Sequence, residues 1–426
     1  MTYAEAIQSL YDLQMFGTSM GLERTRMLAA AAGNPQEGLR FIHVAGTNGK
    51  GSTCAMLESI YRAAGLKVGL YTSPHLVSFR ERMQCNRILI SEGETTELVE
   101  LIQPHLGALS EHPTFFEVVT IMAAIWFQQK KCDLVIWETG LGGRLDATNI
   151  VTPLASVITN VQYDHTKWLG ETLPEIAKEK AGIIKKGVPV ITACDGEEVL
   201  EVIRKKADEM EAPLKIVSPE EIEKFDYSIN LQGNHQRKNG ALALQTVRTL
   251  QHLFPVTEKA VRQGFATVEW QGRFEHLQLK EGQELIIDGA HNEAGVLAFV
   301  ETVNRTLSTT AAERALIIGI LNDKPVERMI PPLAQLANVI CCVKVRNERS
   351  SDPAFLAKLV ALANPKARVE LAETANEALN KVRGHRQVLV TGSLYFIGEF
   401  LQTGKQRLVV DPLESNLNHW GSKRSV

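Results

Sequence analysis

Short apolar runs alternate with amphipathic stretches along nearly the whole chain. The apolar runs are three to five residues long and predict strands at 41–45, 68–71, 133–137, 155–158, 285–288, 315–318, 339–343 and 388–390. The amphipathic stretches predict helices, for example at 52–64, 293–306 and 353–363. Strands that are apolar throughout and separated by helices indicate parallel sheets covered on both faces, so we predict an α/β fold.

The alternation pauses between Phe265 and Phe274 and then restarts, which predicts a domain boundary at 270–272. A length of 426 residues is compatible with two or three domains. We therefore predict one domain over residues 1–271, a second and smaller one over 272–410, and a polar tail over 411–426.

Composition excludes several classes of partner. Hydrophobic residues make up 44% and charged residues 22%, and the 46 basic against 49 acidic residues give a net charge of −3. Such a chain carries no global basic field, so we expect neither nucleic acid nor a membrane surface as partner. No apolar run reaches the roughly 20 residues of a membrane helix, and no signal segment is evident, so we expect a cytoplasmic protein. The six cysteines form no CxxC pair, which predicts reduced thiols, mostly buried or incidental, rather than a zinc site or a disulfide framework.

The strongest chemical signal is a glycine-rich segment, Gly46-Thr47-Asn48-Gly49-Lys50-Gly51-Ser52-Thr53. It follows a predicted strand and opens a predicted helix, where backbone N–H groups and the helix N-terminus can hold phosphate oxygens. Lys50 would reach the terminal phosphates, while Ser52 or Thr53 would face the nucleotide or its metal. The alternative is a turn that only caps the helix, but the lysine and the preceding strand favour phosphate binding.

This loop resembles that of folylpolyglutamate and dihydrofolate synthases, members of the wider Mur ligase family. Further signatures of that family follow in order between about residues 40 and 400: Tyr71–Leu76, Glu138–Asn149, Asp164-His165, Glu179–Lys185, Asp288–Asn292 and Thr391–Phe396. Each is short, but together they are specific. The chain departs from the pattern at Thr139, Gln271 and Glu293, none of which carries a predicted chemical role.

The resemblance implies a P-loop ATPase-like domain followed by a smaller Rossmann-like domain, with ATP between them. It also implies an ATP-dependent ligase that joins L-glutamate to a folate carboxylate through an acyl phosphate. ATP would be a substrate and Mg the metal, because phosphoryl transfer concentrates negative charge that cations stabilise. The expected partners are ATP, L-glutamate and folate or dihydropteroate, and we expect a monomer.

The resemblance also assigns roles to individual residues. The nucleotide contacts are Thr47, Asn48, Gly49, Lys50, Gly51, Ser52, Asn239, Arg273, Asp288 and His291. The metal ligands are Ser73, Glu138 and His165. The acceptor contacts are Thr114, Phe115, Phe116, Glu117, Leu145, Asp146, Ala147 and Arg80, the last within a mobile loop over 74–84. The catalytic residues are Lys50, His165 and Lys180, and Lys180 resembles a lysine that CO2 carbamylates.

Some of these residues also lie at sequence positions that suit the roles the resemblance implies. Glu138 follows an apolar strand, at the sheet edge where ligands bind in open α/β folds. Phe115 and Phe116 could stack on a flat heterocycle or simply pack in a core, and the sequence leaves both possibilities open.

Three other functions remain open at this level. The first is dihydrofolate synthase, alone or combined with the polyglutamate activity, because the motifs do not separate the two. The second is a cell-wall Mur ligase, which Gly51 disfavours because that loop usually lacks this glycine. The third is a nucleotide-binding module without ligase chemistry, which would hydrolyse ATP without needing glutamate or a pterin acceptor.

Overall fold

The structure is a computed structural model that describes residues 1–13, 21–107 and 111–404. The predicted tail at 411–426 and the last residues of the predicted second domain lie outside these ranges. The chain separates into two compact units. Of the described residues, the first contains those within Met1–Pro74, Arg80–Asn230 and His235–Glu269, and the second contains His75–Phe79, Leu231–Asn234 and those from Trp270 onward.

The first unit is built on an eight-stranded sheet with the order β4-β3-β2-β5-β1-β6-β7-β8. Six strands run parallel, and β3 and β4 add an antiparallel edge beside β2. The strands are β1 (Phe41–Ala45), β2 (Val68–Tyr71), β3 (Met83–Cys85), β4 (Ile88–Leu89), β5 (Leu134–Glu138), β6 (Ala155–Ile158), β7 (Val190–Thr192) and β8 (Leu214–Ile216).

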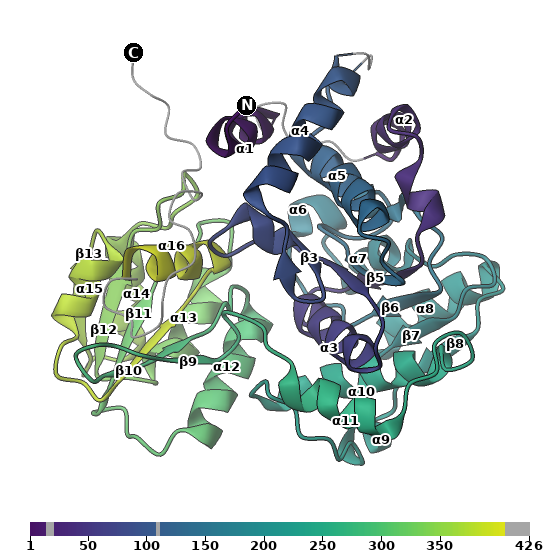
Figure 1. Ribbon diagram of the computed structural model, residues 1–426. Coiled ribbons are helices and arrows are strands. Elements are labelled where there is room, and N and C mark those ends of the chain that lie inside the picture. The colour runs from purple at the N-terminus through teal and green to yellow at the C-terminus, as the bar shows by residue number, and fades with distance from the viewer. Residues whose placement is uncertain (14–20, 108–110, 405–426) are drawn as a thin grey trace. The chain divides into compact units, whose positions relative to one another are not determined.

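Eleven helices of the described chain accompany this sheet. They are α1 (Tyr3–Asp12), α2 (Glu23–Ala31), α3 (Lys50–Ala63), α4 (Glu92–Leu106), α5 (Phe115–Gln129), α6 (Thr166–Leu169), α7 (Leu173–Ala181), α8 (Glu197–Glu209), α9 (Pro219–Glu223), α10 (Asn234–Thr249) and α11 (Glu258–Thr267). Short 3₁₀ turns occur at η2 (Pro35–Gly38), η3 (Phe79–Arg82) and η4 (Ala147–Ile150). Helices α3 and α11 lie side by side (Figure 1), and the Ser59 hydroxyl donates to the Gly264 carbonyl across them at 2.8 Å.

The second unit is built on a six-stranded sheet with the order β13-β12-β11-β14-β10-β9, in which only β9 runs antiparallel to its neighbour. The strands are β9 (Glu275–Gln278), β10 (Glu284–Ile287), β11 (Arg314–Ile318), β12 (Val339–Val343), β13 (Arg368–Ala372) and β14 (Gln387–Thr391). The helices are α12 (Glu293–Thr306), α13 (Val326–Ala334), α14 (Pro353–Ala363), α15 (Ala375–Lys381) and α16 (Leu394–Gly404).

Both faces of this second sheet are covered. On one face, alternate strand residues such as Leu285 and Ile317 pack with α15 and α16. On the other face, Ile286 and Ile318 pack with α12, α13 and α14. This two-sided burial explains why the central strands are apolar throughout instead of alternating with polar residues.

The predicted α/β class with mostly parallel sheets is confirmed. The strands predicted at 41–45, 68–71, 155–158 and 339–343 and the helices predicted at 293–306 and 353–363 have the observed bounds. The sequence pattern missed β4, β8, β9 and β13, which are partly exposed strands at sheet edges. It also missed β3 and β7, which are buried but only three residues long. Within the described ranges, none of the helices combines the length and the apolar character that crossing a membrane requires.

Candidate functional site

The glycine-rich loop links the carboxyl end of β1 to the first turn of α3, as the sequence predicts. Gly46 has φ 154° and Gly49 has φ 82°. A Cβ atom on Gly46 would lie 1.8 Å from the Thr159 hydroxyl, and one on Gly49 would lie 2.5 Å from the Asn239 amide oxygen. Glycine is therefore needed at both positions because neighbouring side chains fill the space, and Gly49 also has a left-handed backbone.

The loop is fixed from outside by the segment that follows β6. Thr47 and Asn48 donate their backbone N–H groups to the carbonyl and side-chain oxygens of Asn160, at 3.0 and 2.8 Å. The Thr159 hydroxyl donates to the Asn48 carbonyl at 2.6 Å, and the Asn48 amide donates to the Gln162 side chain at 2.7 Å. Sequence reasoning missed these three anchoring residues, although they directly follow a predicted strand of the same sheet.

Lys50 is the first residue of α3, and its ammonium lies within the loop. It donates to the carbonyls of Gly46 and Thr47 at 3.1 and 3.2 Å. Two residues further on, the Ser52 hydroxyl accepts from Gln236 at 3.3 Å, and Gln236 accepts from Asn239 at 3.0 Å. The structure therefore brings the predicted nucleotide contact Asn239, on α10, against the predicted phosphate loop.

Glu138 is the last residue of β5 and is 3% exposed. Its carboxylate accepts the backbone N–H of Ser73 at 3.2 Å, so two predicted metal ligands are neighbours. The hydroxyl of Thr53, on the first turns of α3, is buried without a hydrogen-bond partner.

His165 lies just before α6 in a left-handed conformation, with φ 50°. Its side chain is 41% exposed, whereas that of Asp164 is 7% exposed. Asp164 accepts the His165 backbone N–H at 2.8 Å and lies 3.9 Å from the imidazole. Within the described chain, no three His, Cys, Asp or Glu side chains gather as a metal-binding group. His165 therefore belongs to no such group of three.

Lys180 is buried near the end of α7, with 2% of its surface exposed. Burial lowers the pKa of its amine to about 7, and the positive charge of Lys50 contributes to the shift. The carboxylates of Asp164 and Asp146 oppose it. Because a charged amine is poorly solvated there, Lys180 has a large neutral fraction near pH 7.

A glycine-rich turn packs against the end of the helix that carries Lys180. A Cβ on Gly143 would lie 2.9 and 3.0 Å from the carbonyls of Glu179 and Lys180. Arg144 donates its backbone N–H to the Glu179 carbonyl at 2.7 Å and its guanidinium to the Glu179 carboxylate at 2.8 and 3.0 Å. Asn149 then donates to the Gly182 carbonyl at 3.0 Å. The signatures Glu138–Asn149 and Glu179–Lys185 are therefore in direct contact.

Asp146 is used within this turn. It is 6% exposed and accepts the backbone N–H groups of Leu141 and Thr148 at 2.7 and 3.0 Å, together with the Thr148 hydroxyl. The Thr148 hydroxyl also contacts the buried His43 imidazole at 2.9 Å. Burial lowers the pKa of His43 to about 3 and raises the pKa of Asp146. Asp146 thus shapes the turn that carries Leu145 and Ala147, which gives it a structural role beside the predicted acceptor contact.

The predicted acceptor segment begins α5. Thr114 and Glu117 cap this helix reciprocally, and Glu117 also pairs with Arg24 at 3.3 Å. Phe115 is 7% exposed and stacks on Tyr11, with ring centroids 5.6 Å apart. Phe116 is half-buried and lies against Gly140, where a Cβ would be 2.5 Å from the ring. Of the two aromatic residues, Phe115 is thus mainly a packing residue.

Arg80 lies in the η3 turn and donates to the Ile90 carbonyl at 2.5 Å. The residues just before it, His75–Phe79, group with the second unit, and Leu76 and Val77 belong to the core of that unit. Part of the segment predicted to be a mobile loop is therefore buried.

The second unit carries the remaining predicted nucleotide residues. Asp288 follows β10 and accepts the backbone N–H groups of Phe274 and Ala290 at 2.9 and 2.8 Å. Burial raises its pKa to about 6, although the charge of Arg273 acts in the opposite direction. The His291 imidazole contacts the Gly289 carbonyl through Nδ1 at 2.8 Å, which requires a proton on Nδ1. Asn292, not His291, caps α12.

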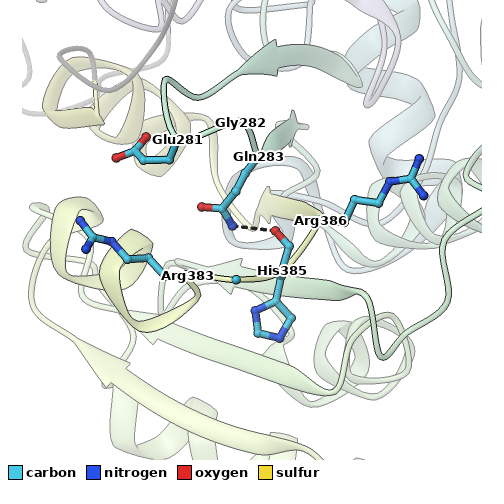
Figure 2. A pocket seen from close by; sticks show the side chains of 7 residues that line it. Glu281, Gly282, Gln283, Arg383, His385 and Arg386 are labelled. Carbon is cyan, nitrogen blue, oxygen red and sulfur yellow. Dashed lines mark hydrogen bonds between the residues drawn. The ribbon is translucent and has the colours of Figure 1, made fainter.

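A hollow of about 530 Å³ lies elsewhere in the second unit, between the β9–β10 turn and the turn before β14. Figure 2 shows the side chains of Arg383 and Arg386 pointing to opposite sides of it. The Gln283 amide donates to the His385 carbonyl at 2.7 Å. Because its charged groups diverge, this hollow does not resemble a site for a compact charged ligand.

Family comparisons match both units. Residues 44–247 match the Mur ligase middle domain, and residues 272–394 match the Mur ligase glutamate ligase domain. The chain is 37% identical over 424 residues to a dihydrofolate synthase/folylpolyglutamate synthase of Bacillus subtilis, covering 93% of this chain and 98% of that protein. It is 31% identical to a folylpolyglutamate synthase of Lacticaseibacillus casei, covering 95% and 99%.

Solved structures agree with this relationship. Mycobacterium tuberculosis folylpolyglutamate synthase complexed with ADP and AMPPCP superposes with a TM-score of 0.85 at 27% identity, covering 96% of this chain and all of that chain. Escherichia coli FolC in complex with DHPP and ADP superposes with a TM-score of 0.82 at 29% identity, covering 96% and 98%.

Two α/β units of Mur ligase type, with a glycine-rich loop at the carboxyl edge of the first sheet, define an ATP-dependent ligase. Within that class, the family is shown by relatives that match this chain over nearly the full length of both proteins. The chain belongs to the folylpolyglutamate synthase/dihydrofolate synthase family of the Mur ligases. The enzyme class predicted from the sequence is confirmed.

Proposed function

We propose that this enzyme adds L-glutamate to the glutamate carboxylate of a folate. The observation that carries the proposal is the convergence of the Lys50 loop and the buried Lys180 in a unit whose relatives include folylpolyglutamate synthases. A carboxylate resists attack by an amine, so it must first be activated. A carboxylate oxygen attacks the γ-phosphorus of ATP, ADP leaves, and an acyl phosphate forms. The glutamate nitrogen then attacks the acyl carbon, loses a proton and displaces phosphate.

We assign nucleotide binding to Thr47, Asn48, Gly49, Lys50, Gly51, Ser52 and Asn239 in the first unit and to Arg273, Asp288 and His291 in the second. The backbone N–H groups at the start of α3 and the Lys50 ammonium supply positive charge where phosphate charge develops. The Asn160 and Gln162 contacts hold the loop in shape, so little reorganisation is needed when phosphate binds.

Mg fits the residues of the first unit. Glu138 and Ser73 offer oxygen ligands at the carboxyl edge of the sheet, and the unpartnered Thr53 hydroxyl lies on the adjoining helix. Mg usually binds one or two protein carboxylates and completes its shell with water and phosphates, so a larger cluster is not required. When bound, it would offset phosphate charge. Its binding by the protein alone can be measured by calorimetry, and Glu138→Gln should weaken it.

We also propose that Lys180 is carbamylated. Its neutral amine nitrogen would attack the carbon of CO2 and lose a proton, leaving a carbamate anion on the side chain. The lowered pKa supplies the neutral amine, and the nearby positive charge of Lys50 favours the anion. The amine is buried, and Gly143 and Arg144 lie against the end of the helix that carries it.

The acceptor is tested by phosphate release with and without L-glutamate, using dihydropteroate or tetrahydrofolate as acceptor, with the product identified by mass. The proposal expects release that needs both glutamate and tetrahydrofolate and yields a folate longer by one glutamate. Release with dihydropteroate as well would show the bifunctional form, which the name of the Bacillus subtilis relative favours. Release with dihydropteroate alone would make the enzyme a dihydrofolate synthase. Phosphate release that needs neither L-glutamate nor a pterin acceptor would overturn the proposal.

A further inference from the structure

Two cysteines far apart in sequence meet beside β2, outside the groups assigned above. Cys85 ends β3, and Cys132 lies in the turn between α5 and β5. Their sulfur atoms are 3.8 Å apart although the residues are 47 positions apart. Strands β3 and β5 flank β2 on its two sides, with Gly69 opposite Cys85 and Val68 opposite Leu134.

The backbone on both sides of this pair is well fixed. Asn86, directly after Cys85, donates its backbone N–H to the Val68 carbonyl at 2.9 Å and accepts the Val68 N–H on its side chain at 2.8 Å. The Cys132 N–H donates to the Phe127 carbonyl at 3.1 Å. Asp133 and Lys67 exchange two hydrogen bonds of 2.8 Å. The two sulfurs are thus held close by backbone contacts, so the pairing does not depend on long mobile side chains.

The surroundings favour a thiolate on Cys85. The Cys132 thiol stabilises it by hydrogen bonding, and the charges of Lys67 and Lys130 add to the effect. Burial and the carboxylate of Glu58 oppose it, and the net result is a pKa of about 7. Cys85 keeps 8% of its surface exposed and Cys132 is half-buried, so a small reagent can reach the pair.

The other four cysteines differ from Cys85 in the direction of the pKa shift of the thiol. Cys54, Cys194, Cys341 and Cys342 are buried, and burial raises the pKa of each thiol. Cys341 and Cys342 are adjacent in sequence, but their side chains enter the cores on opposite faces of the second sheet. Reactivity should therefore be confined to Cys85 and Cys132.

We propose that Cys85 and Cys132 form a peroxide-reactive dithiol that closes to an intramolecular disulfide and reopens with a thiol reductant. The Cys85 thiolate attacks one peroxide oxygen, the O–O bond breaks, and the departing hydroxide takes up a proton to become water. Cys85 is then a sulfenic acid. The Cys132 sulfur attacks the Cys85 sulfur, its proton passes to the leaving hydroxide, and a second water forms. The two thiols lose two electrons, and the peroxide gains them.

The bond would tie the end of β3 to the start of β5 and close a covalent loop that contains β4, α4 and α5. The start of α5 is the proposed acceptor segment, so the modification lies in the same stretch of chain. The chemistry itself is independent of which acceptor the enzyme uses.

The test uses the reduced full-length protein and a small excess of hydrogen peroxide. Remaining thiols are alkylated in denaturant, and peptides are mapped without reduction. The expected result is a linked Cys85–Cys132 peptide pair lighter by about 2 Da, the two hydrogens lost, which dithiothreitol reverses. With dimedone present, Cys132→Ser should carry a sulfenic acid adduct on Cys85 at least about tenfold above any adduct on Cys194.

Cys85→Ser should show neither the link nor the adduct, and Cys194→Ser, a matched change at a buried thiol, should form the link normally. Cys132→Ala replaces Cys132→Ser if the latter does not fold, and the wild-type map requires no variant. A wild-type map without the linked pair, or with a link between other cysteines, would overturn the proposal. Labelling of Cys194 equal to that of Cys85 would do the same.

Discussion

Lys180 is a buried lysine, and burial disfavours the charged form of its amine. Its helix, α7, also carries Lys178, two positions earlier and exposed. The two lysines share a helix but differ in surroundings, so the buried one can be tested against the exposed one.

Replacing Lys180 by alanine should remove most ligase activity, because the carbamate it would carry is lost. Added acetate should restore part of that activity by supplying a small carboxylate in the vacated space. In the wild-type protein, ¹³C-labelled bicarbonate should give a carbamate carbon signal that Lys180→Ala lacks. Lys178→Ala should retain both the signal and the activity. A fully active Lys180→Ala enzyme would show that the carbamate has no role.

We expect Lys50 to supply positive charge to the site and to contribute little to the stability of the fold. In Lys50→Ala the ammonium within the loop is missing, so phosphate release should fall by orders of magnitude, each factor of ten corresponding to about 1.4 kcal/mol. Lys50→Ala loses two hydrogen bonds to loop carbonyls, but the melting temperature should change little, because the contacts from Thr159, Asn160 and Gln162 still fix the loop. The matched control is Lys205→Ala at an exposed position of α8. Near-normal turnover in Lys50→Ala would show that the loop has been misassigned.

At the scale of elements, the important contact is between the glycine-rich turn before η4 and the end of α7. Gly143 lies against two carbonyl oxygens of that helix, and backbone atoms cannot rotate away as a side chain can. This contact joins two signatures more than thirty residues apart along the chain.

Gly143→Ala should therefore displace the end of α7 and cost about 1–3 kcal/mol of stability, the usual cost of overpacking. It should also lower activity, because Lys180 moves with the helix. Gly93→Ala is the matched control, since Gly93 lies in α4 with no atom within 4 Å of an added Cβ, and alanine favours a helix. Urea denaturation and phosphate release measure the two effects. Equal stability of Gly143→Ala and Gly93→Ala would contradict a close contact between the turn and α7.

For the whole molecule, the lowered pKa of Lys180 predicts how stability depends on pH. The amine has a pKa of about 7 in the folded protein and about 10.4 in an unfolded chain, so the unfolded state binds more protons between these values. The destabilisation caused by the buried charge is fully present below pH 7. It disappears as the pH rises from 7 towards 10.4.

Lys180→Met should consequently be more stable than the wild type at pH 6.5, by an amount on the order of a few kcal/mol. The difference should shrink towards pH 10. The urea midpoints of both proteins in CO2-free buffer provide the measurement, and Lys178→Met should show no such trend. A difference that stays constant across this range would mean that Lys180 is not buried in its charged form.

The sequence by itself determined the α/β class and the position of the glycine-rich loop between a strand and a helix. Continuous apolar runs occur where strands are buried on both faces, and a strand, a glycine-rich turn and a helix are consecutive in sequence. Family signatures add the residues of the site, whose roles in this chain remain proposals. All of this information lies within short segments.

Only the tertiary structure decided which segments meet. It placed Asn160 and Gln162 against the loop, buried Lys180, and brought Cys85 to Cys132. It also formed edge strands such as β9 and β13, whose mixed residues give no clear periodic signal. The physical reason is that burial, a shifted pKa and the distance between two thiols depend on residues distant in sequence, whereas a local pattern records only the neighbours along the chain.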